Sequence, residues 1–211
     1  FFKQKTAYEI RPRDWSSDVC SSNLIFDVET LGVESTAVVL SAALIHFDPE
    51  KRPTYQDMLD NACFVKFSVK EQADAKRTMS KSTMQWWGEQ HKYVKQVSFM
   101  ASNDDMSVVD GVGYLTNYMN KHDPNREQTM WARGSLDQLE IDSLCVQFDM
   151  QELTGYNRWR DVRTAVDILY GTDNGYCEVD HPLFERHNVI KHHPVHDCAL
   201  DAMQLMYGKS V

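Results

Sequence analysis

The sequence lacks the marks of a membrane protein and of a disulfide-bonded secreted domain. Its 211 residues contain no uninterrupted apolar run of the about 18 residues that a membrane-spanning helix needs. The five cysteines are odd in number and widely separated, and no two of them form a C-x-x-C pair. This usage argues against a disulfide framework and indicates a reducing compartment, so we expect a cytoplasmic protein.

Positive charge is also scarce. The chain has 22 Lys and Arg against 31 Asp and Glu, which gives a net charge of -9 at pH 7. A globally basic nucleic-acid-binding domain is therefore excluded, and any contact with phosphate groups must come from local Arg and Lys side chains or from bound metal cations. Hydrophobic residues make up 42% of the chain, which excludes disorder and is enough for the core of one domain over residues 23–211.

The first 22 residues do not fit that domain. They show neither a strand period nor a helical period, and they lack the apolar core of a secretory signal. Their sequence resembles the translation of a sequencing adapter. We therefore expect residues 1–22 to be a non-native or disordered leader.

Hydrophobic patterning predicts alternating strands and helices in the rest of the chain. Dense apolar or alternating segments predict strands over 24–30, 37–47, 62–69 and 129–132. Helical stripes and caps predict helices over 81–95, 108–119, 137–148 and about 197–206, and a short strand running into a helix over 158–170. This order is typical of an α/β layer sandwich with a mixed central sheet.

Two carboxylates lie in the first predicted strand. Side chains alternate along a strand, so Asp27 and Glu29 project from the same face about 7 Å apart. Like charges in an apolar strand are costly unless a divalent cation lies between them. The alternative is that the strand ends at Asp27 and that both acids are solvated.

A histidine and an aspartate lie at the start of the last predicted helix. His196 and Asp201 are five positions apart, so they would point about 140° apart if both were helical. They can meet only if His196 lies in the loop or the first turn. His192 and Asp197 repeat the same offset, and we prefer His196 because Asp201 precedes the apolar end of the helix. The alternative is a surface helix capped by Asp197.

Two further features have ordinary explanations. Asp137 follows a predicted strand and a glycine turn, where an aspartate is usually a helix cap or dipole partner. The histidines 192, 193 and 196 cluster with Cys198, but no second Cys/His pair lies at zinc-finger spacing. A zinc module is therefore the weaker interpretation.

Taken together, the blocks of the sequence resemble the DEDDh exonucleases, whose fold is ribonuclease H-like. The closest resemblance is to the phage exonuclease A and RNase T-like 3′ exoribonuclease group. It rests on four blocks: Ser82-Thr83-x-x-Trp86-Trp87-x-x-Gln90, Trp131-x-Arg133-Gly134, Arg160-Asp161-Val162-Arg163-Thr164 and His196-Asp197-Cys198-Ala199-x-Asp201. The resemblance implies a ribonuclease H-like three-layer sandwich with a mixed sheet flanked by helices.

The resemblance also implies a metal-dependent 3′-5′ exonuclease that releases nucleoside 5′-monophosphates from DNA or RNA. It assigns two Mg²⁺ or Mn²⁺ ions to Asp27, Glu29, Asp137 and Asp201, and the general base to His196. The substrate-binding candidates are Thr30, Leu31, Trp86, Trp87, Arg133, Arg160 and Arg163.

Several alternatives stay open at this point. At most one of the adjacent Trp86 and Trp87 can stack on a base, and Arg160 and Arg163 can equally be structural. The partner is expected to be the 3′ end of a single strand in a bacterial or phage-infected cell, and a homodimer is possible. A catalytically impaired nucleic-acid-binding module of the same fold is the alternative function.

Overall fold

The computed structural model describes residues 23–210, and the predicted leader over residues 1–22 lies outside the described residues. Five strands form one mixed sheet in the order β3-β2-β1-β4-β5. The central strand β1 is antiparallel to β2 and parallel to β4, and β5 continues the sheet in parallel beyond β4. The strands are β1 (Asn23–Thr30), β2 (Val39–Phe47), β3 (Cys63–Lys66), β4 (Thr129–Ala132) and β5 (Trp159–Asp161).

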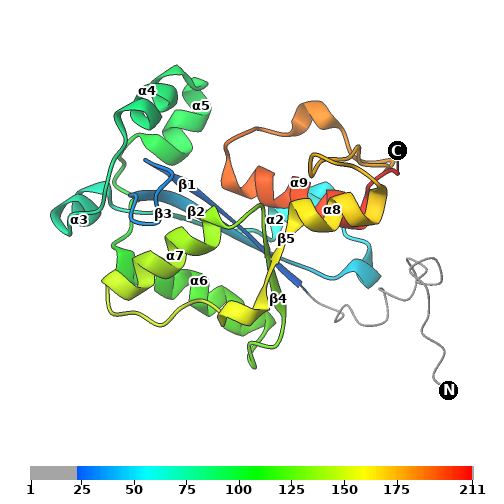
Figure 1. The fold of residues 1–211 in the computed structure, drawn as a ribbon, viewed down its shortest axis with the longest axis horizontal. Helices are drawn as coiled ribbons and strands as arrows, with labels where there is room; N and C mark the ends of the chain where they lie inside the picture. The colour runs from blue at the N-terminus through cyan, green and yellow to red at the C-terminus, as the bar shows by residue number, and fades with distance from the viewer. Residues whose placement is uncertain (1–22, 211) are drawn as a thin grey trace.

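Helices cover both faces of this sheet, so the predicted three-layer sandwich with a mixed sheet is confirmed (Figure 1). α6 and α7 pack on one face, and α9, flanked by α2 and α8, packs on the other. The helices are α2 (Tyr55–Asp60), α3 (Val69–Asp74), α4 (Lys81–Glu89), α5 (Lys92–Val94), α6 (Val108–His122), α7 (Leu136–Gln147), α8 (Val162–Tyr170) and α9 (Pro194–Tyr207). Shorter helical turns are η2 (Pro49–Lys51), η3 (Lys95–Phe99), η4 (Tyr156–Arg158) and η5 (Arg186–Asn188).

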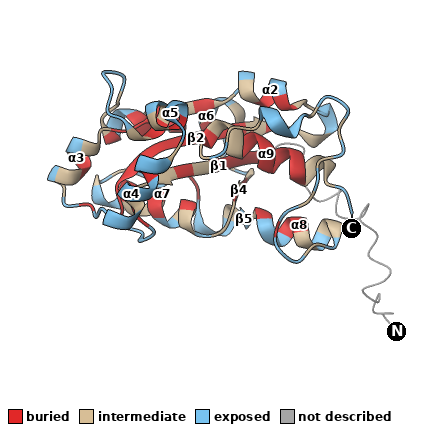
Figure 2. Ribbon diagram, turned by 90° about the horizontal axis from the view of Figure 1, so that it is seen from above, coloured by how far each residue is buried: buried red, intermediate tan, exposed pale blue. Residues whose placement is uncertain are grey.

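The alternation of side chains along β1 divides the core into two halves. Leu24, Phe26 and Val28 face α6 and α7, while Ile25 packs against α8 and α9. Figure 2 shows the buried residues concentrated on β1, β2 and the inner side of α9. Because Asp27 and Glu29 share the face of Ile25, their carboxylates lie on the side of the sheet that α9 covers.

The structure differs from the sequence prediction mainly at helix starts. The third strand ends at Lys66 rather than at residue 69, because the side chain of Ser68 accepts a hydrogen bond from the backbone of Glu71 and starts α3 there. The last helix begins at Pro194 rather than near residue 197. Proline fits the first helical turn because its missing N–H has no partner there in any helix. Within residues 23–210, no helix is long and apolar enough to cross a membrane.

Candidate active site

The acids of β1 lie at the end of the strand that points toward the N-terminal turns of α7 and α9. Asp27 and Glu29 are each partly buried. The buried Oδ2 of Asp27 accepts no hydrogen bond from any of the described residues. Burying a carboxylate oxygen without a hydrogen-bond donor costs free energy. A cation bound to Oδ2 of Asp27 would offset this cost.

Asp137 reaches β1 from the first turn of α7. The chain turns at Gly134, whose φ of 91° is in the left-handed region that glycine adopts readily, and its N–H donates to Oδ2 of Asp161 at 2.7 Å. The buried side chain of Asp137 then accepts a hydrogen bond of 3.3 Å from the backbone N–H of Val28. This bond fixes Asp137 beside the two acids of β1.

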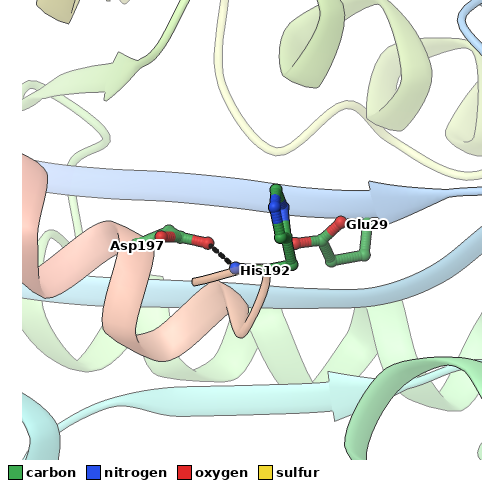
Figure 3. A group of neighbouring side chains, drawn as sticks. All are labelled: Glu29, His192 and Asp197. Atoms are coloured by element: carbon green, nitrogen blue, oxygen red, sulfur yellow. Dashed lines mark hydrogen bonds between the residues drawn. The ribbon is translucent and has the colours of Figure 1, made fainter. Parts of the chain in front are cut away.

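The start of α9 contributes Asp197 and His192, which form a cluster with Glu29. One ligand atom from each of the three residues lies within 4.8 Å of the other two. Figure 3 shows the imidazole of His192 beside the carboxylate of Glu29, with Asp197 on the adjoining turn. The backbone N–H of His192 donates to Oδ2 of Asp197 at 2.8 Å, which holds the loop against the helix.

The pKa values report how strongly these acids interact. Burial, and then the charges of Asp137 and Glu29, raises the pKa of Asp27 well above its usual range. Burial, followed by the charge of Asp197, does the same for Glu29. Burial also raises the pKa of Asp137 to about 7 and that of Asp197 to about 7. The charge of Asp201 also raises the pKa values of Asp27, Asp137 and Asp197. These five carboxylates therefore share one electrostatic site, in which a cation would offset their repulsion.

His196, the base expected from the sequence, is not part of this cluster. Because α9 begins at Pro194, His196 is helical and lies about 140° around the axis from Asp201. Its Nδ1 shares a hydrogen bond of 2.7 Å with the hydroxyl of Tyr55 in α2. The ring therefore helps to join α9 to α2, and the structure does not bring it to the acids.

Asp201 lies beside the acids, but its carboxylate is already paired. Nε and Nη2 of Arg133 donate to Oδ1 of Asp201 at 2.8 and 2.6 Å. The same guanidinium donates to the carbonyl of Gly175 at 2.6 Å and stacks on Tyr176, with 4.3 Å between Cζ and the ring centroid. Arg133 and Asp201 thus form a structural pair next to the site.

The two tryptophans have different surroundings. Trp87 is 1% exposed, and its Nε1 donates to the carbonyl of Thr30 at 2.9 Å. Trp86 is 38% exposed and packs edge-to-face on His192, with 4.7 Å between ring centroids. Leu31 is buried in the same small core as Trp87. Of these candidates, Trp86 is the aromatic side chain that solvent and substrate can reach.

The candidate arginines 160 and 163 lie at the carboxyl end of β5. Arg163 lies near enough to lower the pKa values of Asp137 and Asp201, although burial dominates both and raises them. Arg160 is exposed, donates to the carbonyls of Asn157 and Trp159 at 2.8 Å, and lines a cavity of about 280 Å³. The cavity is lined by Gly134, Ser135, Gln138, Trp159, Arg160 and Asp161.

Cys198 belongs to the core. Its Sγ lies 3.7 and 3.6 Å from the carbonyl oxygens of Ile25 and Ala43, between β1 and β2. The thiol therefore points away from the cluster of His192 and Glu29, and the zinc module considered from the sequence does not form here.

The sequence contained the signal for the pair that the structure brings to the acids. His192 and Asp197 have the same five-residue offset as His196 and Asp201, and Pro194 lies between them. Read as the first helical residue, Pro194 places His192 before the helix and Asp197 in its first turn. That register puts the histidine in the loop, where it can turn toward β1.

Comparisons with known proteins identify the family to which this chain belongs. The family described as the 3′-5′ exoribonuclease Rv2179c-like domain matches residues 22–207. An exodeoxyribonuclease of Enterobacteria phage T4 is 29% identical over 206 residues, covering 88% of this chain and 88% of that protein. The nuclease domain of 3'hExo, a DEDDh family member solved with bound rAMP, superposes with a TM-score of 0.57 at 10% identity, covering 88% of this chain and 92% of that chain.

The fold and the acidic site on its central strand define an exonuclease of the DEDDh type with a ribonuclease H-like fold, a hydrolase that acts on nucleic acid. Within that class, the chain belongs to the Rv2179c-like family of 3′-5′ exoribonuclease domains.

Proposed function

We propose that this exonuclease trims the 3′ end of single-stranded nucleic acid with the help of two divalent cations, Mg²⁺ or Mn²⁺, and releases nucleoside 5′-monophosphates. The observation that carries the proposal is the convergence of Asp27 and Glu29 from β1 with Asp137 from α7 and Asp197 from α9. We propose Asp197 rather than Asp201 as the fourth ligand, because Oδ1 of Asp201 already accepts two hydrogen bonds from Arg133.

The donor set fits hard divalent cations. All four groups are carboxylates, the ligands that Mg²⁺ and Mn²⁺ prefer, and Oδ2 of Asp27 is buried without a donor among the described residues. When bound, two such ions supply charge stabilisation to the scissile phosphate and lower the pKa of the attacking water. The carboxylates themselves fix the site, because β1, α7 and α9 hold them without the substrate.

His192 is the proposed general base. It lies in the loop before α9 beside Glu29, and burial, followed by the charge of Lys191, lowers the pKa of its imidazole. The ring is therefore neutral at pH 7 and can take a proton from water that approaches the acids. Its edge-to-face contact with Trp86 orients the ring.

Substrate contacts are proposed for side chains around the rim of the site. The exposed Trp86 can stack on the terminal base, a contact worth about 1–3 kcal/mol per base. Arg163 and Arg160 supply positive charge at the carboxyl end of β5. Since the chain carries a net charge of -9, these local contacts favour a short 3′ end over a long tract.

The names of the relatives refer to both kinds of nucleic acid. The family is described as an exoribonuclease domain, and the phage protein is named an exodeoxyribonuclease. We propose that the site accepts 3′ ends of either kind, since a 2′-hydroxyl is distinguished by one or two contacts. The homodimer and the cytoplasmic location stay predictions.

The proposal is tested with 5′-labelled RNA and DNA oligonucleotides and two matched variants, Asp197→Asn and Asp201→Asn. We expect the wild type to shorten the strands from the 3′ end only with Mg²⁺ or Mn²⁺. Asp197→Asn should lower the rate by at least about 100-fold, because it removes a metal ligand. Asp201→Asn should mainly lower stability, by about 1–3 kcal/mol, through its weaker bond to Arg133.

Strand shortening without added metal and in the presence of EDTA would contradict the cation requirement. If the rate falls in Asp201→Asn but not in Asp197→Asn, both measured well below the Tm of Asp201→Asn, the fourth metal ligand is Asp201 and not Asp197. A wild type that retards the oligonucleotides without shortening them would support the binding module.

A further inference from the structure

The cluster of Glu29, His192 and Asp197 adds an imidazole nitrogen, which the proposed Mg²⁺ site does not use, to two carboxylates of that site. It combines one imidazole nitrogen with two carboxylate oxygens, all within 4.8 Å of one another. Figure 3 shows that the three side chains come from β1, from the loop before α9 and from α9 itself. α9 packs directly on β1, so these parts are fixed relative to one another.

The imidazole is held at this place by its surroundings. His192 has a φ of 61°, a left-handed conformation that is uncommon for residues other than glycine. Its backbone N–H is bonded to Asp197 at 2.8 Å, and its ring rests against Trp86. The loop therefore presents the ring to Glu29 and Asp197 before any ion arrives.

A nitrogen ligand changes which cation the cluster prefers. Mg²⁺ selects oxygen ligands and keeps several of its waters, whereas Zn²⁺ binds imidazole nitrogen and carboxylate oxygen at about 2.0–2.2 Å. In the first-row series, a nitrogen-containing site also binds Zn²⁺ more tightly than Mn²⁺, although Cu²⁺ binds most tightly. Three protein ligands of these two kinds leave the fourth position of a four-coordinate zinc ion open for water.

We propose that Glu29, His192 and Asp197 bind Zn²⁺ as a mixed nitrogen and oxygen site, and that this binding inhibits the enzyme in competition with Mg²⁺. The zinc site itself follows from the cluster, while the inhibition rests on the proposed function, in which His192 is the base and the two acids hold Mg²⁺. A histidine whose nitrogen is bound to Zn²⁺ can no longer accept a proton from water.

The required adjustment is small. Ligand atoms of a four-coordinate ion with bonds of about 2.0–2.2 Å lie about 3–3.5 Å apart. The atoms of the cluster, within 4.8 Å of one another, therefore need to approach by about 1–2 Å. Glu29 can supply this movement by rotating its long side chain, while the backbone of β1 stays in place.

The test measures the binding of Zn²⁺ and of Mn²⁺ separately from activity, on the full chain. Zn²⁺ affinity is obtained by calorimetry and Mn²⁺ affinity by electron spin resonance, for the wild type, His192→Gln and Glu29→Gln. His196→Gln is the matched control, because His196 is a histidine of the same segment that lies outside the cluster. Co²⁺ added in place of Zn²⁺ reports a four-coordinate site through its stronger visible absorption.

We expect His192→Gln to weaken Zn²⁺ binding by at least about 10-fold and to leave Mn²⁺ binding unchanged, because only Zn²⁺ uses the imidazole. Glu29→Gln should weaken both, and His196→Gln neither. In the wild type, saturating Zn²⁺ should lower the Mg²⁺-supported rate by at least about 10-fold.

Equal Zn²⁺ affinity in the wild type and His192→Gln would overturn the zinc site and leave the proposed function standing. Zn²⁺ that binds through His192 without lowering the Mg²⁺-supported rate would overturn the inhibition. Failure of the proposed function has a separate signature, which is a wild type that never shortens a strand with Mg²⁺.

Discussion

At the scale of single residues, two histidines four positions apart have opposite surroundings. His192 lies before α9 and contacts Trp86 and the acids, whereas His196 lies inside α9 and is bonded to Tyr55. The backbone decides this difference, because the left-handed conformation of His192 in the loop sets the direction of its ring, whereas a helical residue points where the helix face points. The proposed mechanism therefore assigns proton transfer to His192, while His196 contributes to helix packing.

His192→Gln should lower kcat by about 10²–10⁴-fold with little change in KM, the usual contribution of a general base. His196→Gln should keep its turnover and lose about 0.5–1.5 kcal/mol of unfolding free energy through its bond to Tyr55. Steady-state kinetics and urea unfolding of both variants test these two expectations. The assignment is wrong if kcat falls in His196→Gln and survives in His192→Gln.

At the scale of elements, α7 is held in place by a buried ion pair one turn below Asp137. Arg77 and Glu140 are both 0% exposed, and Nη2 of Arg77 donates to Oε2 of Glu140 at 3.2 Å. The same guanidinium donates from Nε to the carbonyl of Ala37 at 2.8 Å, in the segment between β1 and β2. The pair therefore connects the helix that carries Asp137 to the strand that carries Asp27 and Glu29.

Arg77→Met should lower the unfolding free energy by about 3–5 kcal/mol, because it leaves Glu140 buried without its partner. Adding Glu140→Gln to that variant should recover part of the loss, since the second change removes the buried charge. Lys70→Ala, which breaks the exposed pair of Lys70 with Asp74, is the control and should leave unfolding unchanged. Denaturant unfolding measures all three, and equal losses for both pairs would contradict the argument.

At the scale of the whole molecule, the crowding of acids links stability to pH and to metal. Burial raises the pKa of Asp197 to about 7, above the about 3.9 of an unfolded aspartate. At pH values between about 4 and about 7, the folded state therefore keeps a proton on Asp197 that the unfolded state has released. The stability due to that proton is complete below about pH 4 and is lost as the pH rises through about 7.

Asp197→Asn, which mimics the protonated acid, should have nearly the Tm of the wild type at pH 5 without metal and a higher Tm at pH 8. Saturating Mg²⁺ at pH 8 should reverse the order, because a ligand at 100 times its Kd adds about 2.7 kcal/mol to the protein that binds it. Thermal unfolding with and without EDTA measures the crossover. A Tm difference that does not change with pH or Mg²⁺ would contradict a metal role for Asp197.

The fold class, the two acids of β1 and the acid at the start of α7 could all be predicted from the amino-acid sequence. These follow from local rules, since strand alternation puts Asp27 and Glu29 on one face and the strand-turn-helix pattern puts Asp137 at a helix start. The resemblance to DEDDh exonucleases rests on the order of such blocks, and the comparisons confirm it.

The two equal offsets at the end of the chain are distinguished by contacts that form between distant segments. His192 with Asp197 and His196 with Asp201 are alike in spacing, and they differ only in what faces them across the fold. Arg133 reaches Asp201 from the end of β4, and Tyr55 reaches His196 from α2, so these two side chains already have partners. Contacts between segments about 70 and 140 positions apart are set by packing, and no pattern within one helix encodes them.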